Sequence, residues 1–208
     1  MTTEASRPGF LTGIVLAAGA SRRMGRPKAL LPLGDRCLLQ HVVDAALASR
    51  LDEVVVVLGC DAAEIAAALA RPAAGRARVV LKSDYPQGQS TSLTAGLAAA
   101  DESATAAAIL LGDHPTLTAA AIDRVADAFE RSERPAARPV YPDAGDAPGH
   151  PVLLDRSLWS SLTRLSGDQG ARFLLARHPE WLLAVPVAGA PPPDVDTRED
   201  YERVAGID

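Results

Sequence analysis

Short apolar runs alternate with amphipathic segments along almost the whole of this 208-residue chain. The runs 13–17, 54–58 and 106–111 have the composition expected of strands that are buried on both faces. Between them, apolar residues recur at helical spacing, as in a helix that packs one face against a sheet. This alternation predicts an α/β fold of three layers, in which helices cover both faces of a mainly parallel sheet through right-handed crossovers.

The same pattern gives an expected order of elements, preceded by a flexible tail over 1–12. Thr118 and Thr197 are expected to cap the helices that follow them, and Asp61 is expected to cap another. Strands are expected over 13–17, 54–58, 77–81, 106–111, 138–141, 152–154 and 182–187. Helices are expected over 38–47, 62–70, 90–100, 119–131, 156–165 and 169–177, and after residue 197.

Composition narrows the class of protein. The length and the 48% hydrophobic content suit a single domain over 13–208, and a net charge of -5 argues against nucleic-acid binding. Cys37 and Cys60 form no CxxC pair, so neither a disulfide nor a zinc site is indicated. The apolar runs are too short to span a membrane and the polar N-terminus lacks an apolar signal region, so a cytoplasmic protein is expected.

The segment from Leu16 to Lys28 joins the first apolar run to a loop of small and basic residues. Gly19 and Ser21 would let backbone amides approach phosphate oxygens, and Gly25 permits a turn. Four basic side chains lie within seven residues of an acidic protein, which favours a small polyanion. We interpret the segment as a phosphate site. The alternative is an ordinary strand-to-helix loop with solvated charges.

Lys28 is unusual because only two of the 21 basic side chains are lysines, the other being Lys82. Since arginine is the usual cation in this chain, a lysine at this position favours a compact point charge. Such a charge can hold a single phosphoryl oxygen where a planar guanidinium would bind two.

Two carboxylates are predicted to bind a metal. The apolar run 106–111 leads directly to Asp113, which places its carboxylate at the rim of the sheet, where ligands of parallel sheets bind. Asp196 is preferred to Asp194 because it precedes the expected cap Thr197, which should fix its position. Asp113 and Asp196 together suit Mg²⁺. The alternatives are a simple turn aspartate and an acidic helix N-terminus.

Three polar turns supply further candidates. The segment 88–92 begins a helix with more hydroxyl side chains than a cap requires, so Gly88 and Ser92 are candidates for contacts with a base or ribose. The turns 149–151 and 166–172 adjoin apolar segments, as the acceptor side of a cleft would. Their candidate residues are His150, Asp168 and Arg172. A structural role is the alternative for the histidine.

Six motifs together resemble the MobA-like nucleotidyltransferases, and within them the molybdenum cofactor cytidylyltransferase branch. The motifs are Leu16-Ala-Ala-Gly-x-Ser-x-Arg-Met-Gly-x-x-Lys28, Gly88-x-x-x-Ser92-Leu93, Leu111-Gly-Asp-x-Pro115, Gly149-His-Pro151, Gly167-Asp-x-Gly-Ala-Arg172 and Asp194-x-Asp-Thr197. The resemblance extends over about 14–201. It implies a Rossmann-like fold of the nucleotide-diphospho-sugar transferase type, with a nucleotide-binding half (about 13–115) and an acceptor-binding half (about 116–208).

The resemblance also implies a reaction, in which a nucleoside monophosphate moves from an NTP to an acceptor and pyrophosphate is released. By this resemblance Arg23 and Lys28 hold the phosphates, Asp113 is catalytic, and Asp113 with Asp196 binds Mg²⁺. The implied nucleotide-binding residues are Leu16, Ala17, Ala18, Gly19, Ser21, Gly25, Lys28, Gly88 and Ser92. The implied acceptor-binding residues are His150, Asp168 and Arg172.

The implied substrates are CTP and a molybdopterin-type acceptor, with a molybdoenzyme or its chaperone as a partner. Ala17-Ala18-Gly19 favours CTP, because members that use GTP tend to read Ala-Gly-Gly. His114 and Pro148 depart from the pattern, which usually has glutamine and commonly arginine at these positions, and His114 is assigned no chemistry.

Three alternatives remain open. The first is the same chemistry with GTP or with another phosphorylated acceptor, a sugar phosphate or phospho-acid. The second is a dinucleotide-dependent oxidoreductase, although Gly19 and Gly25 do not form a GxGxxG motif. The third is a non-catalytic cofactor chaperone.

Overall fold

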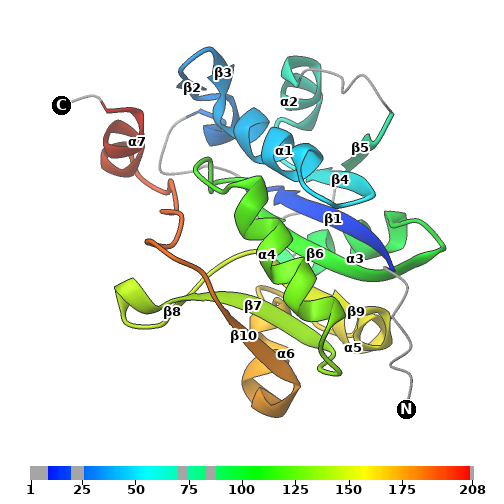
Figure 1. Ribbon diagram of the computed structural model, residues 1–208. Helices are drawn as coiled ribbons and strands as arrows, with labels where there is room; N and C mark the ends of the chain where they lie inside the picture. The colour runs from blue at the N-terminus through cyan, green and yellow to red at the C-terminus, as the bar shows by residue number, and fades with distance from the viewer. Residues whose placement is uncertain (1–8, 20–25, 70–74, 83–87, 207–208) are drawn as a thin grey trace.

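A sheet of eight strands runs through the middle of the protein, in the order β10-β7-β9-β6-β1-β4-β5, with β8 paired to β7 (Figure 1). The computed structural model describes residues 9–19, 26–69, 75–82 and 88–206. The strands are β1 (Phe10–Ala17), β4 (Glu53–Leu58), β5 (Ala77–Leu81), β6 (Ala104–Leu111), β7 (Ala136–Tyr141), β8 (Ala147–Pro148), β9 (Val152–Asp155) and β10 (Leu182–Pro186). A separate hairpin consists of β2 (Pro32–Leu33) and β3 (Arg36–Cys37).

The sheet is mostly parallel. Strands β4, β1 and β6 pair in parallel, as do β4 with β5 and β7 with β10. Strand β9 is antiparallel to both β6 and β7, so those two neighbours point the same way. The carboxyl ends of β1, β6, β7 and β10 therefore lie at one edge of the sheet. The chain runs outward from β1 to β4 and β5 and then returns to β6 on the other side of β1, which makes the gap between β1 and β6 a topological switch point.

Helices cover both faces, as the alternation of the sequence predicts (Figure 1). The α-helices are α1 (Leu38–Ala48), α2 (Ala62–Ala68), α3 (Gln89–Ala99), α4 (Ala119–Glu130), α5 (Trp159–Leu162), α6 (Ala171–Arg177) and α7 (Arg198–Ala205). Leu11 and Val15 of β1 belong to the core that α1, α2 and α4 complete, whereas Ile14 faces the core of α3, α5 and α6. Apolar residues on both faces of one strand explain why its sequence reads as an unbroken apolar run. The Rossmann-like α/β class is confirmed.

Several expected boundaries differ from the structure. β1 begins at Phe10, which pairs with Ala104, so the last three residues of the expected tail are strand. The helix expected over 156–165 divides into the 3-10 helix η4 (Arg156–Leu158) and the short α5, and α6 begins two residues later than expected. None of the helices within the described ranges is long and apolar enough to cross a bilayer.

The predicted helix caps had mixed outcomes. Thr118 and Thr197 cap α4 and α7 through their side chains, as expected. Asp61 stands at the N-cap of α2 but makes no capping hydrogen bond. Its φ of 54° is left-handed, whereas a capping side chain requires an extended backbone at that position.

Candidate functional site

Three distant parts of the chain converge on Lys28 at the switch point. Lys28 begins the 3-10 helix η1 (Lys28–Leu30) beyond β1, and Asp113 follows the end of β6. The Lys28 Nζ lies 2.6 Å from Asp113 Oδ2 and 3.1 Å from Asp196 Oδ1. A Cβ at Gly112 would lie 2.8 Å from the Cβ of Ala17, so the close approach of β1 and β6 requires glycine there.

Lys28 is a permanent cation at this position. Burial opposes a charged ammonium, but the hydrogen bonds and negative charges of Asp113 and Asp196 outweigh burial and raise the pKa of Lys28. At neutral pH the side chain is therefore charged. It can neutralise an anion but cannot act as a proton acceptor.

Val195 anchors the segment that brings the C-terminal carboxylates to the site. Its backbone amide donates a 3.1 Å hydrogen bond to the carbonyl of Asp113, and its side chain is fully buried. The residues on either side of it are Asp194, which contacts His114, and Asp196. Burial of one apolar residue therefore fixes both carboxylates beside the loop that follows β6.

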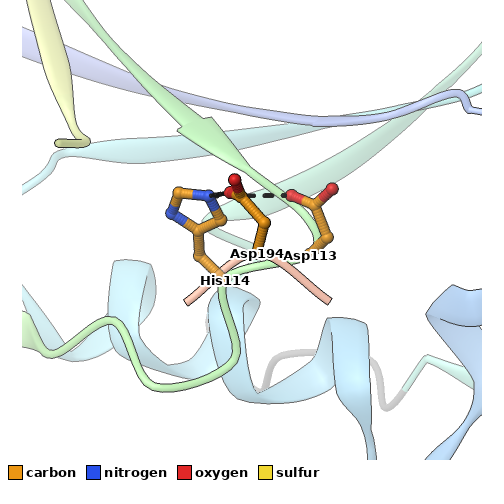
Figure 2. Close-up of side chains that lie close together, drawn as sticks. All are labelled: Asp113, His114 and Asp194. Carbon is orange, nitrogen blue, oxygen red and sulfur yellow. Dashed lines mark hydrogen bonds and ion pairs between the residues drawn. The ribbon is translucent and has the colours of Figure 1, made fainter. Parts of the chain in front are cut away.

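A second group of side chains adjoins Lys28 and consists of Asp113, His114 and Asp194 (Figure 2). His114 Nε2 contacts Asp194 Oδ1 and lies 3.9 Å from Asp113 Oδ1. One potential ligand atom from each residue lies within 4.8 Å of the others. His114 is only 5% exposed, while 64% of the Asp194 side chain is exposed, so the group opens to solvent on the aspartate side.

Two carboxylates and an imidazole are a donor set that fits a divalent cation. Mg²⁺ prefers oxygen ligands, and a nitrogen ligand shifts the preference toward first-row transition metals such as Mn²⁺. Asp113 is common to this group and to the predicted pair with Asp196. The assignment of Mg²⁺ to Asp113 and Asp196 stays a prediction, and Asp194 enters as a third candidate ligand.

His150 packs against His114. Their rings pack edge to face with centroids 5.5 Å apart, and His150 Nδ1 lies 3.1 Å from the carbonyl oxygen of Ile109. Burial lowers the pKa of His150 to about 4, and the neighbouring His114 acts in the same direction. His150 is therefore neutral near pH 7, with Nδ1 donating to the carbonyl and Nε2 left as an acceptor.

The predicted phosphate loop is described only in part. Leu16 and Ala17 end β1, Ala18 is buried, and Gly19 is exposed. The other predicted members lie outside the described residues, and their phosphate contacts stay predictions: Ser21, Arg23 and Gly25.

The start of α3 packs against the turn 166–170. Gly88 has a φ of 110°, and a Cβ there would lie 2.2 Å from the carbonyl carbon of Gly167. The Ser90 amide donates a 3.1 Å hydrogen bond to the Gly167 carbonyl. Ser92 is 4% exposed, so its hydroxyl lies largely inside the fold. This contact joins the predicted nucleotide-binding side to the predicted acceptor-binding side.

The remaining predicted acceptor residues lie beyond that contact. Asp168 is exposed within the turn, and Arg172 is exposed in the first turn of α6. Sequence reasoning assigns no chemistry to His114 and prefers Asp196 to Asp194. The structure places His114 and Asp194 beside Asp113, and it brings Asp196 to Lys28, the partner of Asp113. The signal that could have indicated this is the apolar Val195 between the two aspartates, because a single buried residue fixes both of its neighbours.

The chain is similar to known proteins over most of its length. The model of the MobA-like NTP transferase domain family matches residues 13–181. The nicotine blue oxidoreductase of Paenarthrobacter nicotinovorans is 35% identical over 180 residues, covering 83% of this chain and 84% of that protein. The purine catabolism protein PucB of Bacillus subtilis is 32% identical over 205 residues, covering 95% of this chain and 97% of that protein.

A solved structure is similar over nearly the whole chain. The crystal structure of Rv0371c from Mycobacterium tuberculosis H37Rv superposes with a TM-score of 0.83 at 32% identity, covering 96% of this chain and 99% of that one. The same mycobacterial protein has also been solved in complex with manganese. The chain therefore belongs to the MobA-like NTP transferase domain family and is a nucleotidyltransferase.

Proposed function

We propose that this protein transfers CMP from CTP to the phosphate of a molybdopterin-type acceptor, with Mg²⁺ or a related divalent cation and release of pyrophosphate. One observation carries the proposal: Lys28, Asp113 and Asp196 meet within hydrogen-bonding distance at the switch point of the sheet. Ligands bind at such points in open α/β sheets, and these residue types suit a triphosphate with its metal.

The positively and negatively charged residues of the site have different roles in the proposed reaction. An acceptor phosphate is already a nucleophile, so the reaction needs alignment and charge neutralisation more than a strong base. Lys28 supplies a fixed positive charge for the phosphate that is transferred. Asp113 with Asp194, Asp196 and His114 would hold the divalent cation, which supplies further positive charge for the phosphate oxygens.

The choice of substrates rests on weaker signals than the reaction class. Ala17-Ala18-Gly19 supports CTP as donor, with GTP as the alternative. His150, which packs against His114, and the turn before Arg172, which contacts the start of α3, support a phosphorylated acceptor at this site. A sugar phosphate or a phospho-acid is the alternative acceptor. A molybdoenzyme or its chaperone as partner and a cytoplasmic location stay predictions.

The decisive measurement is pyrophosphate release from each of the four NTPs with molybdopterin and with phosphorylated sugars, in the presence of Mg²⁺ or Mn²⁺. CTP with molybdopterin should give the highest kcat/KM. Turnover with another donor and acceptor, and none with this pair, would reject the substrate assignment while keeping the reaction class.

Variants of the converging residues separate catalysis from folding. Asp113→Ala and Lys28→Gln should each lower kcat/KM by roughly 10²-fold or more, because each removes charge that acts on the transferred phosphate. Asp35→Asn changes an exposed aspartate outside the site and should retain activity. No pyrophosphate release by the wild type, together with equal cofactor delivery by wild type and Asp113→Ala, would instead support the cofactor chaperone.

The relative from P. nicotinovorans is named an oxidoreductase, which favours a second candidate. A dinucleotide-dependent oxidoreductase would bind and consume NADH or NADPH, and a fluorescence titration with both cofactors tests it. Tight binding of either, together with no pyrophosphate release from any NTP, would replace the transferase assignment.

A further inference from the structure

Arg138 is a partly buried cation in the middle of β7. Its Nε is enclosed by the protein, and among the described residues it has no hydrogen-bond partner. Ala136, two residues earlier, packs in the core with Ala171 and Leu175 of α6. Because alternate residues of a strand share a face, Arg138 lies on the α6 face of the sheet.

Arg172 places a second positive charge near the first. It lies in the first turn of α6, and among the described residues its side chain forms no hydrogen bond or ion pair. Burial lowers the pKa of Arg138, and the charge of Arg172 lowers it further. Within the described part of the chain neither guanidinium has an ion pair, so the partial burial of Arg138 and its repulsion by Arg172 carry a cost that a bound anion would offset.

The position of this pair connects it to the candidate site. The Gly149 amide donates a 3.1 Å hydrogen bond to the carbonyl of Pro139, so the turn that carries His150 runs beside Arg138. On the other side, the turn that precedes Arg172 packs against the start of α3 through Gly167. Arg138 therefore adjoins the turn that carries His150, and Arg172 follows the turn that contacts the predicted nucleoside side.

We propose that Arg138 and Arg172 form an anion-binding site that holds the phosphate group of the acceptor. This inference rests on the proposed transfer to a phosphorylated acceptor, and it adds Arg138, which the sequence does not single out. A planar guanidinium donates two parallel hydrogen bonds to a phosphate, which positions the group as well as binding it. The bound phosphate supplies a negative charge, which the two side chains do not receive from an ion pair with any described residue.

The test titrates inorganic phosphate by calorimetry into the full chain saturated with α,β-methylene CTP and a divalent cation. Filling the donor site first confines phosphate to the acceptor side. Arg138→Gln and Arg172→Gln should each weaken phosphate binding by roughly tenfold or more, because each loses charge-assisted hydrogen bonds. Arg138→Lys keeps the positive charge but loses the planar pair of donors, so its phosphate affinity should lie between those of the wild type and Arg138→Gln.

Arg177→Gln is the matched control, because Arg177 lies on the same helix but over the ring of Phe173. It should bind phosphate as the wild type does. Without phosphate, Arg138→Gln should melt at the wild-type temperature or above it, because it removes an uncompensated charge. If Arg138→Gln does not fold, the phosphate affinities of Arg172→Gln and Arg138→Lys still test the inference.

Steady-state kinetics distinguish the acceptor's phosphate from free phosphate as the natural occupant. Arg138→Gln should raise KM for the phosphorylated acceptor by a similar factor and leave KM for CTP unchanged. Wild-type phosphate affinity in Arg138→Gln overturns the inference, and so does an unchanged KM for the acceptor. Absence of turnover with every NTP would overturn the proposed function alone, because the phosphate titration does not depend on activity.

Discussion

At the residue scale, the two carboxylate oxygens of Asp113 face different partners, Lys28 and His114. Its Oδ2 accepts a hydrogen bond from Lys28, and its Oδ1 faces His114 at 3.9 Å. His114 is nearly buried and contacts Asp194, so its ring can turn little. A held imidazole beside two carboxylates should make the metal preference of this protein depend on His114.

His114→Gln should weaken Mn²⁺ binding by roughly tenfold and Mg²⁺ binding by much less, since only the transition metal gains from the nitrogen ligand. Electron paramagnetic resonance of unbound Mn²⁺ measures the first affinity, and competition by Mg²⁺ measures the second. His178→Gln is the control, because His178 stacks on Trp181 outside the site. Equal losses for the two metals would contradict the role of the imidazole.

Helix α7 shows at the element scale how a cap can serve a site. Thr197 Oγ1 accepts a hydrogen bond from the Asp200 amide at 3.1 Å, and Asp200 Oδ2 accepts from the amides of Thr197 and Asp196 at 3.0 and 3.3 Å. The Thr197 hydroxyl, which donates to Asp200 Oδ2 at 2.9 Å, and these two amides lower the pKa of Asp200, which keeps it ionised. The capping box therefore fixes the backbone of Asp196 as well as the start of the helix.

Thr197→Ala should lower the free energy of unfolding by about 1 kcal/mol and also lower transferase activity, because it releases Asp196 from its position beside Lys28. Thr197→Ser should restore both properties. Thr118→Ala removes the cap of α4 at a similar cost in stability, and it should leave activity unchanged. Denaturant titration and pyrophosphate release measure the two effects. Similar activity losses in Thr118→Ala and Thr197→Ala would show that only stability is involved.

At the scale of the whole molecule, the site joins segments that the hydrogen bonds of the sheet do not connect. Lys28 comes from the segment after β1, Asp113 from the end of β6, and Asp196 from the segment that precedes α7. A ligand bound among them stabilises the contacts of all three segments. Binding should therefore raise the unfolding temperature of the whole chain.

CTP with Mg²⁺ or Mn²⁺, at about 100 times its Kd, should stabilise the protein by about 2.7 kcal/mol, and GTP at the same concentration by less. Differential scanning fluorimetry with each NTP, with and without metal, measures the shift. Asp113→Asn should lose most of the part that depends on metal. A shift with GTP that equals or exceeds the shift with CTP would contradict the assignment of the base.

Most elements were predictable because their signals are local. β5 has the predicted bounds, and the caps Thr118 and Thr197 were identified by residue type next to helical periodicity. The failures also have local reasons. Asp61 has a capping residue type but a left-handed backbone, which the sequence does not reveal. The start of β1 at Phe10 depends on pairing with Ala104, a partner that lies far away in the chain.

The sequence by itself determined the α/β class, the family resemblance and the identity of the chemical groups, because periodicity, caps and motif spacing are properties of neighbouring residues. Only the tertiary structure decided which groups meet. The switch point brings Lys28 to Asp113, and the buried Val195 holds Asp194 beside His114. Arg138 illustrates the same limit, since its Nε has no hydrogen-bond partner among the described residues, and this depends on what packs across the face of β7. Such contacts arise from strand order and burial, which no local pattern encodes.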